Sequence, residues 1–143
     1  MFRFFCALLF SSMLLSTPTH AMQIRISDDR GGRIGTYMGK YEMLRDSGEQ
    51  IVIDGKCLSA CTLVTAFIPK GRVCVTSRAV LGFHAAWDYG NDGRPVTSPG
   101  ATELLMSSYP RPIQAWIKKR GGLTPKMIRL SGRALERLYP RCQ

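Results

Sequence analysis

One short apolar run, QIVIDG at residues 50–55, constrains the fold of this chain more than any other feature. A run of this length and composition is typical of a strand buried in a parallel sheet. Before it, residues 35–45 place apolar side chains at helical spacing, and DSG at 46–48 ends that helix. Strands that alternate with helices in one short chain predict an α/β domain, with a parallel-type sheet and flanking helices.

The rest of the chain supplies further predicted elements. The turn formers DYGNDGRPVTSPG at 88–100 predict a loop. Thr124-Pro125 pairs an N-cap residue with proline at the first helical position, which predicts a final helix toward Leu138. Strands are also expected at 22–27, 72–76 and 79–84, and short helices at 59–67, 101–108 and 113–119.

Residues 1–21 have the pattern of a secretory signal: Arg3, an apolar run from Phe4 to Leu15, and small residues before Met22. The run is too short to span a bilayer, so cleavage is expected before Met22; a retained membrane anchor is the alternative. Residues 22–143 then suffice for one domain. The product is expected to be periplasmic or secreted, with no stable membrane span after the signal is removed.

Four cysteines lie beyond the signal: Cys57, Cys61, Cys74 and Cys142. An oxidising compartment favours disulfides, and four cysteines allow three pairings, which the sequence leaves open; buried free thiols are the alternative. The CxxxC pair is not the CxxC knuckle of zinc sites, and His84 is the only histidine beyond the signal. No metal site and no cofactor are therefore expected.

The full chain has a formal net charge of +10 at pH 7. An exported basic protein can bind anionic lipid, cell-wall polymer or acidic peptide, although a basic excess is more often a solvated surface. The basic residues are scattered along the sequence, and export separates the chain from nucleic acid. Nucleic-acid binding is therefore not expected.

Ser59 lies where the apolar strand gives way to a short helix, in GKCLSACTLV at 55–64. The helix end favours developing negative charge there, and the N–H of Ala60 can donate to an oxyanion. A plain N-cap serine is the alternative interpretation. His84 ends a predicted strand, at the sheet edge where sites assemble, and it is the one imidazole available as a base; a structural histidine is the alternative.

Two segments resemble the Clp protease proteolytic subunit and the wider ClpP/crotonase superfamily. DDRGGRIGTYMGKYEMLRDSGEQIVIDGKCLSACTLV at 28–64 has DRGG where the family has SPGG, then a helix with a tyrosine, a strand ending in glycine, and a serine followed by small residues. GRVCVTSRAVLGFHAAW at 71–87 is similar to the family's arginine–strand–turn–strand segment, which ends in the catalytic histidine. The motifs CxSACTL and GFH are most similar to small exported bacterial ClpP-like proteins.

The resemblance implies a shortened ClpP/crotonase-like fold with a serine hydrolase site. Ser59 would be the nucleophile and His84 the general base, 25 residues apart as in the family. The N–H groups of Gly32 and Ala60 would form the oxyanion hole, because a two-glycine turn lets the backbone approach a peptide carbonyl.

Three departures from the family pattern bear on this prediction. The leading strand–helix unit is missing, so an apolar face needs cover and a homo-oligomer or partner is plausible. The family's catalytic aspartate has no counterpart; Glu136 is the nearest acid, with Asp88, Asp92 and Glu103 as alternatives. The cysteines that flank Ser59 are not part of the peptidase motif, and a disulfide between them would fix the turn.

Two functions follow from the resemblance. The first is an exported serine peptidase that acts on short or unfolded peptides, with a peptide or protein as substrate. The second is an inactive ClpP-like module that binds peptide or a partner protein in the same cleft. Acyl-CoA chemistry of the crotonase type is not expected, because CoA is not expected outside the cytoplasm.

Overall fold

The computed structural model describes residues 22–143. The predicted signal at residues 1–21 lies outside the described residues. Within 22–143, no helix is both long enough and apolar enough to cross a membrane.

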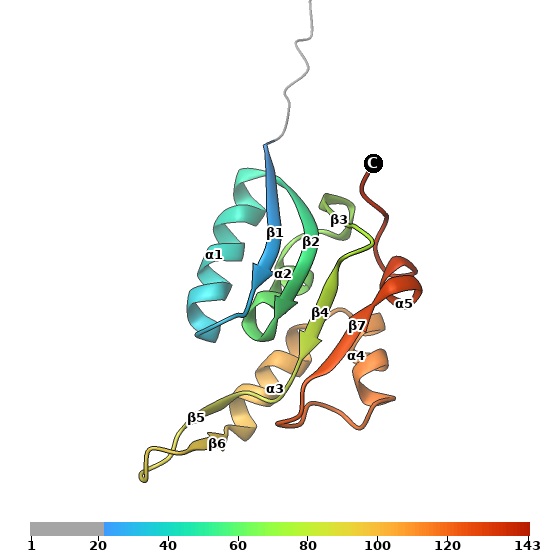
Figure 1. Cartoon of the computed structure of the whole chain (residues 1–143). Coiled ribbons are helices and arrows are strands. Elements are labelled where there is room, and N and C mark those ends of the chain that lie inside the picture. Colours follow the sequence, from blue (N-terminus) through green and yellow to red (C-terminus); the bar gives the residue numbers. More distant parts are fainter. Residues whose placement is uncertain (1–21) are drawn as a thin grey trace, which may run out of the picture.

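Seven strands and five α-helices follow one another along the described residues, together with two short 3₁₀ helices (Figure 1). The strands are β1 (Gln23–Asp29), β2 (Gln50–Leu58), β3 (Val73–Val75), β4 (Val80–Phe83), β5 (Trp87–Tyr89), β6 (Pro95–Thr97) and β7 (Ile128–Ser131). The helices are α1 (Ile34–Ser47), α2 (Val64–Phe67), α3 (Pro99–Ser108), α4 (Arg111–Lys118) and α5 (Gly132–Glu136), with 3₁₀ helices η1 (Ser59–Leu63) and η2 (Lys70–Arg72).

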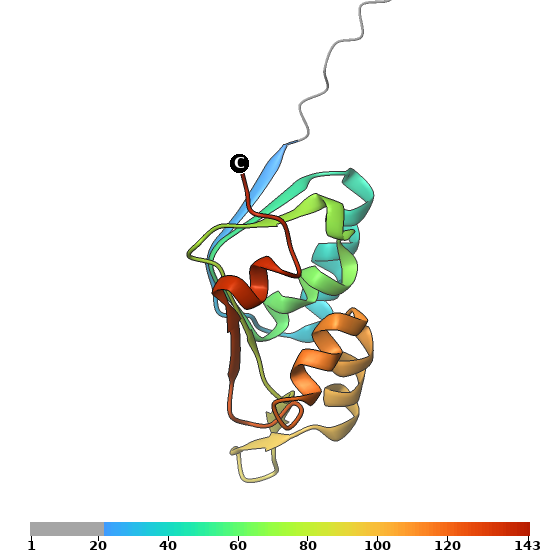
Figure 2. The same ribbon diagram turned by 90° about the vertical axis from the view of Figure 1, so that its right-hand side faces the viewer.

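The main sheet is mostly parallel and is organised around β2. Strand β2 pairs in parallel with β1, β3 and β4, whereas β7 joins β4 antiparallel. Helices α1 to α4 cover one face of this sheet, as the two views show (Figures 1 and 2). The prediction of an α/β domain with a parallel-type sheet and flanking helices is confirmed.

The core lies between the sheet and these helices. Ile51 and Ile53 of β2, Leu81 of β4 and Tyr41 of α1 are fully buried there. Burial of β2 explains why residues 50–55 form a nearly continuous apolar run. The helix prediction for 35–45 is also confirmed, since α1 spans that range and ends at Gly48 in a left-handed conformation.

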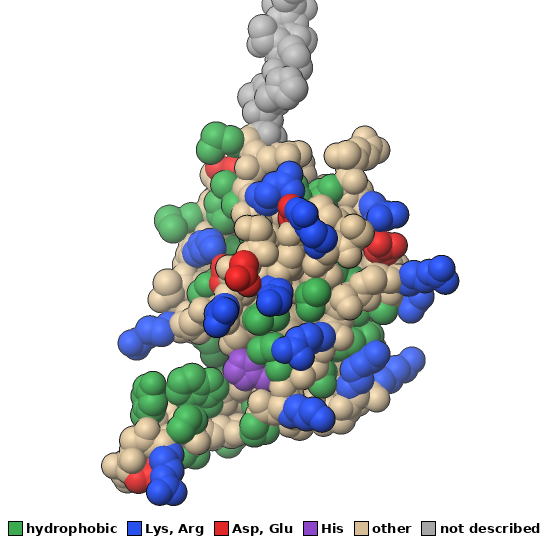
Figure 3. Space-filling model, in the orientation of Figure 1, with side chains coloured by type: hydrophobic (Ala, Val, Ile, Leu, Met, Phe, Trp, Pro, Cys, Tyr) green, Lys and Arg blue, Asp and Glu red, His purple; other side chains and the backbone are tan. Residues whose placement is uncertain are grey.

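The opposite sheet face carries a cluster of charges around one buried carboxylate. Asp54 of β2 accepts hydrogen bonds from Arg25 at 2.6 Å, Arg78 at 2.6 Å and Thr76 at 2.7 Å. These bonds, that of Arg78 first, hold the pKa of Asp54 far below its usual range. On the face shown in Figure 3, basic and acidic side chains alternate with apolar ones over the sheet.

The structure corrects three local predictions. Residues 128–131 form β7 rather than part of a helix from Pro125, because pairing with β4 overrides the local capping pattern. Residues 88–100 are not all loop, since β5 and β6 form a hairpin. Strand β2 continues through Gly55 to Leu58, and Gly55 allows this because a Cβ there would overlap the Ser27 carbonyl of β1.

Two disulfides close within the described chain, Cys57–Cys61 and Cys74–Cys142. They select one of the three pairings that the sequence left open. Disulfides persist in oxidising compartments and are rare in the cytosol, so the pairing fits an exported protein.

Candidate active site

Ser59 and His84 meet at one edge of the sheet. Ser59 follows the last residue of β2 and His84 follows the last residue of β4, and these parallel strands pair Leu58 with Gly82. The carboxyl ends of neighbouring parallel strands lie side by side, which is where sites form in open α/β sheets. Nε2 of His84 lies 2.8 Å from Oγ of Ser59, within hydrogen-bond distance. The sheet thus brings together the two residues predicted as nucleophile and base.

Ser59 has an unusual backbone conformation. Its φ is +56°, the one positive φ at a non-glycine residue in the described part of the chain. A serine in the left-handed region is strained by roughly 1–2 kcal/mol, so its surroundings must hold it there. Strained backbone is common at functional sites, although it does not by itself assign a role.

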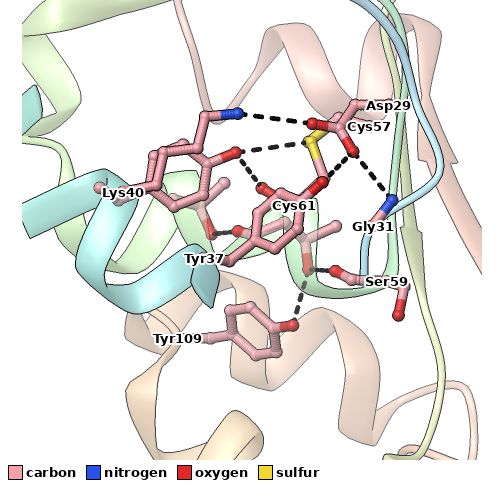
Figure 4. The surroundings of a disulfide bond; sticks show 11 residues. Asp29, Gly31, Tyr37, Lys40, Cys57, Ser59, Cys61 and Tyr109 are labelled. Carbon is pink, nitrogen blue, oxygen red and sulfur yellow. Dashed lines mark hydrogen bonds and ion pairs between the residues drawn. A yellow bond between two sulfur atoms is a disulfide. The ribbon is translucent and has the colours of Figure 1, made fainter. Parts of the chain in front are cut away.

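A disulfide and two hydroxyl groups hold this strained turn (Figure 4). Cys57 and Cys61 bridge across Ser59, with their Cα atoms 5.2 Å apart. Thr62 Oγ1 donates its hydroxyl proton to the Ser59 carbonyl at 2.6 Å. Because a threonine hydroxyl has one proton, the Tyr109 hydroxyl is the donor in its 2.7 Å hydrogen bond with Thr62 Oγ1. Burial raises the pKa of Tyr109 to about 12, which keeps this donor protonated.

Tyr41 of α1 secures the other end of the same turn. The Tyr41 side chain is fully buried, and its hydroxyl donates to the Cys61 carbonyl at 2.9 Å. Burial raises its pKa, so it remains a donor at every physiological pH. The turn is therefore held from the core by α1 as well as by the disulfide.

The Gly31-Gly32 turn packs directly against Ser59. Gly31 has φ +82°, and a Cβ there would lie 2.7 Å from Ser59 Cβ and 2.8 Å from the Ala60 nitrogen. No other residue fits this position, because both the conformation and the space require glycine. The two backbone segments predicted to supply the oxyanion hole, at Gly32 and Ala60, thus adjoin one another.

Asp29 at the end of β1 anchors this glycine turn (Figure 4). Its Oδ1 accepts hydrogen bonds from the Gly31 N–H at 2.8 Å and from the Tyr37 hydroxyl at 2.5 Å. Lys40 lies 3.6 Å from its other oxygen. Burial first, and then the bond to Asp29, raise the pKa of Tyr37 to about 12. The carboxylate therefore fixes the turn through a backbone donor and a side-chain donor from α1.

A cleft of about 730 Å³ opens over Ser59. This volume is within the range of small-ligand and peptide sites, roughly 300–1,000 Å³. Gly32, Ser59 and His84 lie on its floor and walls, and the side chain of Ala60 is buried behind them. Apolar side chains from the hairpin and α3 complete the lining, among them Trp87, Tyr89, Ala101 and Leu105.

None of the acids considered as a third catalytic residue, Glu136, Asp88, Asp92 and Glu103, hydrogen-bonds the imidazole in the described residues. Glu136 pairs with Arg141 at 3.5 Å, and Asp92 pairs with Arg94 at 3.6 Å on the hairpin. Asp88 lines the cleft, but its Oδ1 accepts the Tyr89 N–H at 2.8 Å. Within residues 22–143, no carboxylate hydrogen-bonds His84. The role suggested for Glu136 stays a prediction without a contact to support it.

Two parts of the site escaped the sequence prediction. Asp29 was not singled out, although an aspartate two residues before a glycine is a familiar turn pattern that points to the Gly31 N–H. The turn formers at 88–100 predict a loop where the β5–β6 hairpin lies. No group of three or more metal-ligating side chains occurs in the described residues.

No model of a known protein family matches the chain, and no curated protein matches it in sequence.

Proposed function

We propose that the chain is an exported serine hydrolase of ClpP-like type, acting on peptides, with Ser59 as nucleophile and His84 as general base. The observation that carries the proposal is the 2.8 Å approach of His84 Nε2 to Ser59 Oγ inside the cleft. Nucleophile and base within hydrogen-bond distance are the core of this reaction class. The adjoining glycine turn and the exported, disulfide-bonded character of the chain support it.

The reaction begins when Ser59 Oγ gives its proton to His84 Nε2 and attacks the peptide carbonyl carbon. A C–O bond forms, and the carbonyl electron pair moves onto oxygen, where the N–H groups of Gly32 and Ala60 stabilise the oxyanion. Collapse breaks the C–N bond, and the leaving amine takes the proton from His84. Water then gives a proton to the same imidazole and attacks the acyl carbon. The C–O bond to Ser59 breaks, Oγ takes the proton back from His84, and the carboxylic acid product leaves.

The missing carboxylate predicts a slow enzyme. In a triad, the acid fixes the tautomer with Nε2 as acceptor and stabilises the imidazolium, and losing it lowers kcat by about 10⁴. Here His84 directly follows β4, which lies between β2 and β7, and no acid hydrogen-bonds its ring within the described residues. Residual catalysis from the oxyanion hole and from substrate binding persists in such sites.

Fluorophosphonate labelling of the oxidised protein, followed by peptide mass mapping, tests the proposal. We expect label on Ser59, at a rate at least tenfold higher in wild type than in His84→Ala. Ser107→Ala, which removes an exposed serine on α3, is the matched control and should label like wild type. Equal labelling of wild type and His84→Ala would reject the hydrolase and favour a module that only binds peptide.

A further inference from the structure

Two arginines flank the glycine turn and line the cleft. The motif Arg30-Gly31-Gly32-Arg33 places one arginine on each side of the turn beside Ser59, and both side chains are exposed cleft residues. Among residues 22–143, neither arginine forms an ion pair or a side-chain hydrogen bond. Two other arginines behave differently, since Arg25 of β1 and Arg78 in the turn before β4 are both bound to Asp54.

The acids near the turn leave both guanidinium groups available. Asp29 is occupied by Gly31, Tyr37 and Lys40. Asp88, the one acid that lines the cleft, lies on β5 and accepts the N–H of Tyr89. Arginine guanidinium groups bind carboxylates with a planar, two-pronged geometry, so two free ones in a cleft favour an anionic ligand.

The distribution of basic residues along the chain also favours an anionic ligand. Residues 111–143 hold nine Lys and Arg residues and one acid, Glu136, whereas residues 22–110 hold ten basic and nine acidic residues. The basic residues are scattered along the sequence, but their excess over acidic residues is concentrated in residues 111–143. Basic side chains gather on the side of the molecule formed by β7 and α5 (Figure 3). A field of one sign concentrates ligands of the opposite charge near the cleft.

We infer that the substrates are acidic polypeptides, with Arg30 and Arg33 binding Asp or Glu side chains on either side of the scissile bond. This inference rests on the proposed function, because it places the scissile carbonyl at the turn between the two arginines. The apolar wall formed by Trp87, Tyr89 and Leu105 then contacts the other side chains of the bound segment. Residues 111–143 attract acidic chains at long range, without contact at the cleft.

Two matched fluorogenic peptides test the inference, one with Glu and one with Gln on both sides of the scissile bond. We expect wild type to cleave the Glu peptide with a kcat/KM about tenfold higher than the Gln peptide. The ratio should fall to about one in Arg30→Gln/Arg33→Gln. Lys56→Gln/Lys70→Gln removes the same charge from two exposed lysines that neither line the cleft nor belong to residues 111–143, and should keep the ratio within about twofold of wild type.

Each negative outcome identifies a different failure. If wild type does not react with fluorophosphonate, the proposed function itself fails. If wild type labels at Ser59 but cleaves both peptides equally, the hydrolase stands and the acidic substrate is rejected. Hydrolysis of phosphatidylglycerol vesicles without any preference for the Glu peptide would also overturn the inference, in favour of an anionic lipid.

Discussion

The two disulfides act at opposite ends of strand β2 and have different physical consequences. Cys57–Cys61 closes a short loop, with a sequence separation of 4, around the strained Ser59 at the carboxyl end. Cys74–Cys142 has a separation of 68 and lies near the amino end, where Cys74 pairs with Val52. One cross-link shapes a turn and the other ties the chain terminus to the sheet.

The two disulfides differ in how much loop entropy they remove from the unfolded chain. In the chain-entropy model, closing a loop of about 69 residues stabilises the fold by about 4 kcal/mol, and closing one of about five residues by about 2 kcal/mol. The long cross-link therefore contributes more to the free energy of unfolding. The short one adds a local constraint, since it holds Ser59 in a conformation that serine rarely adopts.

The largest expected effect comes from removing the long cross-link. Cys74→Ser/Cys142→Ser should lower the free energy of unfolding by about 4 kcal/mol in urea titration, because the unfolded chain gains the entropy of an open loop. Fluorophosphonate labelling at low temperature, where the variant is folded, should stay within about twofold of wild type. A large fall in labelling of the folded variant would break the proposed separation of roles.

Removing the short cross-link should give the converse pattern. Cys57→Ser/Cys61→Ser should lower the free energy of unfolding by about 2 kcal/mol, yet slow the labelling of Ser59 about tenfold or more, because the turn relaxes from its strained φ. Rates are compared at equal folded fraction, with the Cys74→Ser/Cys142→Ser variant as the matched control. Unchanged labelling would mean that Tyr41 and Thr62 hold the turn without the disulfide.

Asp29 tests whether the glycine turn is as important for the site as the short disulfide. Asp29→Ala removes the acceptor of the Gly31 N–H and should lower the labelling rate about tenfold and stability by about 1–3 kcal/mol. Asp29→Asn keeps an oxygen acceptor and should stay within about threefold of wild type in labelling. If Asn and Ala behave alike, the charge of Asp29 rather than its hydrogen bonds is responsible.

The smallest effect is expected at Asp54, between the two disulfides along β2, and concerns how the free energy of unfolding changes with pH. Its pKa is depressed in the folded protein, so its stabilising contribution is present above the usual pKa of an aspartate and is lost as pH falls below that value. Near pH 3 the unfolded chain should bind about one proton more at this position than the folded chain. Urea titrations from pH 7 to 3 should show a shallower acid decline for Asp54→Asn than for wild type.

The sequence predicted the placement of Ser59 and His84 at the sheet edge better than it predicted the pairing of the cysteines. Ser59 and His84 each follow an apolar run, and parallel strands in register bring their carboxyl ends together without further information. The pairing of the cysteines depends on distances between residues as far apart as Cys74 and Cys142, which no local pattern contains. The sequence therefore left three pairings open, and the fold decided among them.

The errors in the second half of the chain have a common physical cause. Residues 128–131 alternate apolar and polar, but Thr124-Pro125 before them is also a good helix start, and only pairing with β4 decides for a strand. Likewise, the strands of the β5–β6 hairpin are three residues each and lie among turn formers. Short strands are stabilised by their partners rather than by their own composition.

The positive φ of Ser59 means that the backbone at this position is more strained with serine than it would be with glycine. Glycine adopts this conformation without strain, whereas serine and alanine do not. Ser59→Gly would lack the nucleophile yet fold with a less strained turn than Ser59→Ala. The fold thus keeps the proposed nucleophile at a position where glycine would suit the backbone better, and under the proposed function a Ser59→Gly variant is the form in which to trap an uncleaved peptide.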